Sequence, residues 1–182
     1  MRITGGFLRS RLLKVPEGPV RPTQDMVRAA LFSILGARVP GCRFLDLCAG
    51  TGAVGLEAWS REAREVCWVE SNRRVAGILK DNIETLCGRE GAECRRVFVT
   101  DGVSFVKKGL VDPAFDIVFA DPPYGKQLCD ALLAALKPSP LVAADGLVVL
   151  EQARDEVLTA AGWTVTDTRA YGGSQLVFLR RE

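Results

Sequence analysis

The sequence predicts a single α/β domain whose seven-stranded, mostly parallel sheet ends in an antiparallel hairpin. Short apolar runs alternate with segments of helical periodicity, and this alternation is typical of a parallel sheet covered by helices on both faces. Two final runs, 162–168 and 175–179, flank Tyr171-Gly172-Gly173 at hairpin spacing. With 182 residues, 48% of them hydrophobic, the chain can bury one ample core.

Residues 1–20 are predicted to form a basic amino-terminal arm or a small hairpin, because prolines, glycines and arginines are mixed there. The remaining domain, 21–182, is predicted to begin with a helix after Arg21-Pro22-Thr23, with Thr23 as its N-cap. Apolar residues then recur at steps of three and four, which gives this helix one buried face.

Strand and helix patterns alternate from there to the hairpin. The predicted strands are 43–48, 65–70, 94–99, 115–120 and 145–150. The predicted helices are 53–62, 72–87, 101–109, 126–136 and 152–161. Such repeats form right-handed crossovers, and open sheets of this kind bind ligands at the carboxyl ends of their strands.

A glycine-rich turn follows the first of these strands. Gly50, Gly52 and Gly55 have the spacing G-x-G-x-x-G, and Glu70 ends the next strand about twenty residues later. Glycines let a ligand approach the backbone, and an acid at that distance suits a pair of ribose hydroxyls. The context favours a nucleotide-type cofactor over a purely structural turn.

Asp46 lies four residues before the first glycine. A carboxylate there would repel a pyrophosphate, whereas it suits a ligand with an ammonium or sulfonium charge. The position therefore favours S-adenosylmethionine over NAD. An NAD oxidoreductase stays the weaker alternative, since the chain contains no histidine to relay a proton.

Four successive predicted strands end in or next to an acid: Asp46, Glu70, Asp101 and Asp121. This is more than a solvated rim requires, so we expect the four side chains to surround a ligand. Glu151 ends the fifth strand, and we interpret it as a solvated strand end rather than as part of the pocket.

The segment Asp121-Pro122-Pro123-Tyr124 follows an apolar strand. Two prolines remove two N–H donors, so the turn offers carbonyls and the Asp121 carboxylate as acceptors, with Tyr124 as a flat stacking surface. This combination suits the exocyclic amine of a planar base. The alternative is a rigid turn with a core tyrosine, which the position at a strand end disfavours.

Composition excludes several classes of protein. Without histidine, Ser-His-Asp catalysis, Cys-His catalysis and histidine metal sites are ruled out. The six cysteines form no C-x-x-C pair, and we interpret them as reduced core thiols. No apolar run reaches the length of a membrane span and no signal peptide is recognisable, so we expect a cytoplasmic protein without a membrane contact.

Basic residues are concentrated at the amino terminus. Residues 1–43 contain eight lysines and arginines against Glu17 and Asp25, although the whole chain has a net charge of only +2. This distribution predicts either an anionic partner for the segment or a solvated tail, and the sequence does not decide between them.

Taken together, these motifs resemble those of S-adenosylmethionine-dependent amino-group methyltransferases. More narrowly, Gly5-Gly6, Arg21-Pro22-Thr23 and the Val27–Phe32 stretch resemble the RsmD family, which methylates the N2 amine of one guanine in 16S ribosomal RNA. The resemblance spans nearly the whole chain. It implies the Rossmann-like class I S-adenosylmethionine-dependent methyltransferase fold.

The resemblance also implies roles for individual residues. Asp121, Pro122, Pro123 and Tyr124 would hold the amine for catalysis. Asp46, Gly50 and Gly52 would hold the methionyl part of S-adenosylmethionine, Glu70 its ribose, and Asp101 with Gly102 its adenine, with no metal. Arg9, Arg11, Arg21 and Arg28 would contact phosphates of 16S rRNA or of the small ribosomal subunit. We expect a monomer.

Two alternatives to the guanine-N2 activity stay open. One is an adenine-N6 methyltransferase acting on DNA or RNA, and the other is a non-catalytic RNA-binding factor.

Overall fold

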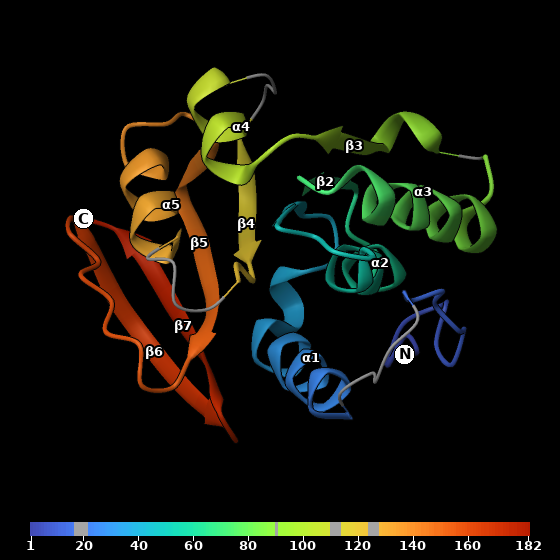
Figure 1. The fold of residues 1–182 in the computed structure, drawn as a ribbon, viewed down its shortest axis with the longest axis horizontal. Coiled ribbons are helices and arrows are strands. Elements are labelled where there is room, and N and C mark those ends of the chain that lie inside the picture. Colours follow the sequence, from blue (N-terminus) through green and yellow to red (C-terminus); the bar gives the residue numbers. More distant parts are fainter. Residues whose placement is uncertain (17–21, 90, 110–113, 124–127) are drawn as a thin grey trace.

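A computed structural model describes residues 1–16, 22–89, 91–109, 114–123 and 128–182, and it contains one seven-stranded sheet (Figure 1). The strand order is β3-β2-β1-β4-β5-β7-β6. The strands are β1 Arg43–Leu47, β2 Glu65–Glu70, β3 Arg95–Val99, β4 Phe115–Ala120, β5 Val142–Ala153, β6 Trp163–Tyr171 and β7 Ser174–Arg181. Strands β1 to β5 pair in parallel, and β7 joins β5 and β6 antiparallel. The predicted fold class is confirmed.

Helices cover both faces of the sheet. They are α1 Pro22–Leu35, α2 Ala53–Ser60, α3 Arg73–Cys87, α4 Gly102–Lys108 and α5 Leu128–Leu136, with short 3₁₀ turns at Gly36–Arg38 and Ala92–Cys94. One buried cluster joins α1, α2 and α3 to the sheet, and the other joins α4 and α5 to the opposite face. Among the residues described, no helix is both long and apolar enough to cross a bilayer.

The topology creates the binding edge. The sheet order reverses between β1 and β4, the two neighbouring strands at its centre. At such a switch point the crossovers leave in opposite directions, so a crevice opens beyond the carboxyl ends of the strands. Side chains alternate along each strand, so Asp46 faces the same side as Phe44, the side on which α1 and α2 pack.

One predicted helix, 152–161, is wrong. Strand β5 continues to Ala153, and no helix follows it before β6 begins at Trp163. Glu151, Gln152 and Ala153 pair with β7 instead. The hydrogen bonds of this antiparallel partner, which lies more than twenty residues away in the sequence, outweigh the local helical pattern.

The amino-terminal segment packs on the domain. An isolated antiparallel bridge joins Arg2 to Leu12, and Ile3, Leu8 and Leu13 are buried in the α1–α2 cluster. The backbone N–H of Phe7 donates to the Ser60 carbonyl over 2.9 Å. For residues 1–16 the solvated-tail alternative is therefore wrong, while the predicted boundary at residue 20 lies outside the described residues.

Candidate active site

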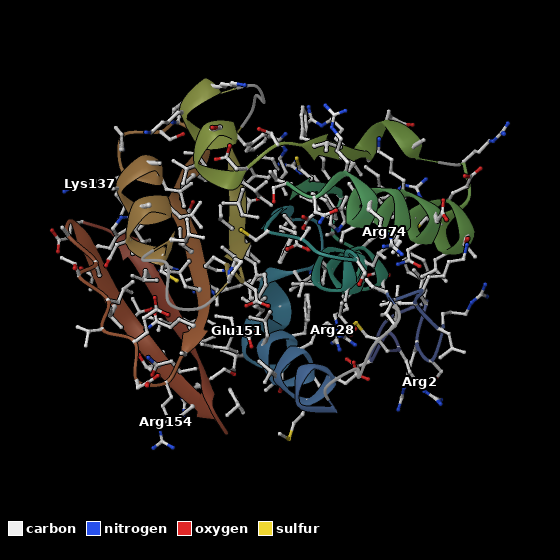
Figure 2. All side chains as sticks on the ribbon, viewed as in Figure 1. Arg2, Arg28, Arg74, Lys137, Glu151 and Arg154 are labelled. Carbon is white, nitrogen blue, oxygen red and sulfur yellow. The ribbon has the colours of Figure 1, made fainter. Side chains whose placement is uncertain are left out.

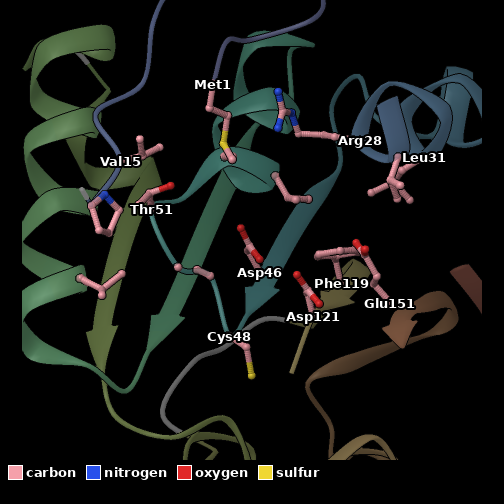
Figure 3. A pocket seen from close by; sticks show the side chains of 17 residues that line it. Met1, Val15, Arg28, Leu31, Asp46, Cys48, Thr51, Phe119, Asp121 and Glu151 are labelled. Carbon is pink, nitrogen blue, oxygen red and sulfur yellow. The ribbon is translucent and has the colours of Figure 1, made fainter. Parts of the chain in front are cut away.

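A cavity of about 420 Å³ lies at the switch point, between α1, the glycine turn and the ends of β1, β4 and β5 (Figure 3). Its polar wall includes Asp46, Asp121 and Glu151, and its apolar wall includes Leu31 and Phe119. Figure 3 shows the carboxylates of Asp46 and Asp121 close together, with Glu151 beside Phe119. The cavity thus combines three carboxylates with an apolar surface, and the buried Arg28 also lines it.

Asp46, at 1% exposure, is the most deeply buried acid of this wall. Its Oδ2 accepts the Gly55 N–H over 2.9 Å. The pKa of Asp46 is raised to about 7, chiefly by burial; the Gly55 N–H opposes this rise, and the charge of Glu70 adds to it. A carboxylate that is costly to ionise in this position is suited to a cationic partner.

The glycines of the turn have different roles. Gly50 has φ +54°, and a Cβ there would meet no atom within 4 Å, so its backbone borders open space in the cavity. Gly52 has φ +84°, and a Cβ there would approach Leu79 Cδ1 to 2.1 Å. Gly50 can therefore serve a ligand, whereas the glycine at 52 is required by the packing of the turn against Leu79 and Trp68.

A second cavity, of about 320 Å³, borders the first through Cys48 and Asp121, which line both. Its walls include Glu70, Asp101 and Gly102, the three residues that were predicted for the nucleoside half of the cofactor. The two cavities therefore lie next to each other along the carboxyl edge of the sheet, with lining residues that extend from Asp101 after β3 to Glu151 of β5.

Backbone groups fix the acids of the second cavity. The two carboxylate oxygens of Glu70 accept the Gly50 N–H over 2.8 Å and the Asn72 N–H over 2.7 Å. Asp101 caps α4 by accepting the Ser104 N–H, and this hydrogen bond lowers its pKa. Backbone N–H groups therefore hold both side chains in place, and the carboxylates keep lone pairs for a ligand.

Asp121 stands at the junction of the two cavities. The pKa of its carboxyl is raised to about 8, chiefly by burial and in addition by the charges of Glu151 and Asp46. Pro122 is buried and Pro123 is exposed. Tyr124 lies outside the described residues, so its predicted stacking role remains a prediction.

Sequence reasoning missed two lining residues. Glu151 borders the main cavity, so its interpretation as a solvated strand end is wrong. Cys48 lines both cavities with φ +62°, an uncommon conformation for a side chain other than glycine. Burial and the nearby acids raise the pKa of its thiol to about 12, so it stays neutral. The signal that could have found Glu151 is its place at the end of a predicted strand, as Asp121 is at the end of the strand before it.

The four arginines predicted to bind RNA have different environments. Arg9 and Arg11 are exposed, and Arg21 lies outside the described residues. Arg28 is 4% exposed, and its guanidinium contacts Glu57 and Asp25 over 3.2 and 3.0 Å. These internal partners oppose the predicted phosphate contact of Arg28, because a phosphate would have to displace them from a buried site.

Comparison with known proteins identifies the family. The family model described as conserved hypothetical protein 95 matches residues 1–180. The chain is also 35% identical to ribosomal RNA small subunit methyltransferase D of Haemophilus influenzae, over 94% of this chain and 89% of that protein. The chain belongs to the RsmD family.

Solved structures support this membership. A hypothetical protein from a Thermus species superposes with a TM-score of 0.80 at 36% identity, covering 99% of each chain. Magnesium protoporphyrin IX methyltransferase of Synechocystis, solved with bound SAM, superposes with a TM-score of 0.68 at 14% identity, covering 92% of this chain and 87% of that one. At that identity the likeness concerns the fold alone.

Proposed function

We propose that this RsmD-family chain transfers a methyl group from S-adenosylmethionine to the exocyclic N2 amine of a guanine in small-subunit ribosomal RNA. The observation that carries the proposal is the position of Asp121, which lines both the 320 Å³ cavity suited to a nucleoside and the 420 Å³ cavity rich in acceptors. The Haemophilus influenzae relative is named for small-subunit rRNA. The N2 amine is inferred from the acceptor chemistry and from the family resemblance.

The residues present fit S-adenosylmethionine. Gly50 offers backbone beside open space, Asp46 offers a buried carboxylate for the positive methionyl end, and Glu70 offers acceptors for ribose hydroxyls. Asp101 and Gly102 would border the adenine. We assign Gly52 no contact with the cofactor, since the close packing of Leu79 and Trp68 explains the need for a glycine at this position.

The bound cofactor would supply an electrophilic methyl group. Asp121 and the Pro122 carbonyl would accept the two amine hydrogens, so that the nitrogen lone pair, otherwise delocalised into the ring, points at that methyl group. The amine gains a carbon and must then lose one proton. The raised pKa of Asp121 makes its carboxylate a suitable acceptor for this proton, which it then passes to water.

RNA would reach the site over the amino-terminal segment. Arg9 and Arg11 are exposed there and can contact phosphates, while Leu8 and Leu13 fix the segment in the core. Arg2 lies on the same side of the molecule (Figure 2). We also infer that the protein acts as a cytoplasmic monomer, and sedimentation of the purified chain tests the oligomeric state.

Transfer of labelled methyl groups tests the proposal. Small-subunit particles lacking the modification, naked 16S RNA and duplex DNA would be compared as acceptors, and the labelled nucleoside identified by digestion and mass spectrometry. We expect N2-methylguanosine in RNA. N6-methyladenine would instead support the adenine alternative, and cofactor binding without transfer to any acceptor would support the non-catalytic RNA-binding factor.

Replacing Asp121 tests its role directly. Asp121→Ala should lower kcat by at least about 10³-fold, because an orienting acceptor and a proton acceptor are lost together. Calorimetry should still detect S-adenosylmethionine binding, since Asp46, Gly50 and Glu70 remain. A variant that retains more than about a tenth of the activity would refute the assigned role.

A further inference from the structure

Glu151 and Asp121 lie side by side at the active edge. In the parallel pairing of β4 with β5, Ala120 lies opposite Leu150. Asp121 follows directly after the end of β4, and Glu151 is the next residue of β5. Both follow a residue of the α1 face by two positions, Phe119 and Val149, and therefore point to the same side. Both line the 420 Å³ cavity, as Figure 3 shows.

Arg28 also lines this cavity, but its guanidinium is paired with Glu57 and Asp25. The ion pairs among the residues that the structure describes include neither Asp121 nor Glu151. Burial raises the pKa of Glu151, and the nearby Ser174 of β7 opposes this rise. Two neighbouring carboxylates without a counter-charge are expensive to maintain, which suggests that substrate donors satisfy them.

The hydrogen-bonding edge of guanine supplies such donors. Its N1–H and its N2 amine lie next to each other and point the same way, so two adjacent carboxylates can each accept a hydrogen from one of them. Adenine presents an amine beside an N1 lone pair, which an ionised carboxylate repels. A base turned out of its stack is read along this edge.

We propose that Glu151 accepts the N1–H of the target guanine while Asp121 accepts the N2 amine, so that Glu151 selects guanine. This inference rests on the proposed function and adds the residue that distinguishes the base. A site built to hydrogen-bond an N–H rejects analogues that lack it, because its own acceptor is left unpaired. Glu151 should therefore lower the methylation rate most for bases whose N1 carries no hydrogen.

The test uses 2-aminopurine, which keeps the 2-amino group but has a lone pair at N1. After the methylated guanine has been mapped, 16S RNA carrying either base at that position would be prepared by ligation, and kcat/KM measured for both. We expect the unmodified protein to prefer guanine by about 100-fold. Glu151→Gln should reduce this ratio at least about tenfold, since an amide can also donate to N1.

Two controls separate selection from structure. Glu151→Asp keeps the charge and should retain most of the preference, and Ser174→Ala, a change on the neighbouring β7 that also removes a hydrogen bond to the Tyr171 carbonyl, should change the ratio little. Unchanged S-adenosylmethionine binding by calorimetry shows that the variants are folded. An unaltered ratio in Glu151→Gln, with guanine methylation otherwise intact, would overturn this inference alone. Failure of the unmodified protein to methylate guanine would overturn the proposed function as well.

Discussion

At the scale of single residues, the site is dominated by carboxyl groups whose ionisation is opposed by burial. Asp46 and Asp121 both have raised pKa values, because each is withdrawn from water and each lies near another acid. Asp101, which is exposed and accepts a backbone N–H, has a lowered pKa. The same type of side chain thus acquires a different pKa from its surroundings.

Activity should depend on pH through Asp121. Its folded-state pKa is raised to about 8, so the carboxylate that accepts the amine hydrogens is depleted as pH falls below that value. We expect kcat/KM to decrease on going from about pH 9 to pH 6. Glu151→Gln removes one of the charges that raise this pKa and should shift the inflection to lower pH. A flat profile in both proteins would contradict this account.

At the scale of elements, the glycine turn between β1 and α2 performs two separable tasks. Gly50→Ala places a methyl group in open space at φ +54°, so it should cost about 1 kcal/mol of stability and weaken S-adenosylmethionine binding. Gly52→Ala overlaps Leu79 and should mainly destabilise the fold. Urea unfolding and calorimetry on the two variants provide the comparison. Equal effects on stability and binding would show that the tasks are not separate.

The amino-terminal segment, α1 and α2 are joined at Glu57, which is fully buried. Its carboxylate accepts the N–H and the hydroxyl of Thr4, both over 2.7 Å, and forms ion pairs with Arg28 and Arg61. Glu57→Gln removes one of the two carboxylates paired with the buried Arg28, so the free energy of unfolding should fall by about 3 kcal/mol. Glu84→Gln, an exposed charge on α3, is the control, and urea titration measures both. A loss below about 0.5 kcal/mol would contradict the role of Glu57.

At the scale of the whole molecule, the exposed Arg9 and Arg11 do not line the main cavity, so the RNA backbone and the target base would meet different surfaces. Arg9→Ala and Arg11→Ala should each weaken RNA binding and reduce the slope of log affinity against log salt by about 1. Arg154→Ala is a suitable control, since this exposed arginine lies far from Arg2 in Figure 2. Filter binding over a salt series measures the slopes, and identical slopes for all variants would exclude the proposed RNA path.

The sequence by itself determined the fold class, the order of the elements apart from the helix predicted at 152–161, and the positions of Asp46, Glu70, Asp101 and Asp121 at strand ends. These features depend on local periodicity, on glycine turns and on the rule that parallel strands end at one edge. The family is confirmed, while the roles of the predicted site residues remain predictions.

Only the tertiary structure decided the roles of Gly52, Arg28 and Glu151. Each depends on a partner far away in the sequence. Leu79 packs against Gly52, Glu57 pairs with Arg28, and the pairing of β5 with β4 places Glu151 beside Asp121. The same is true of the predicted helix 152–161, which β7 replaces by strand pairing as far as Ala153. Local patterns specify what a segment can form, but burial and register are set by the neighbours that the folded chain brings to it.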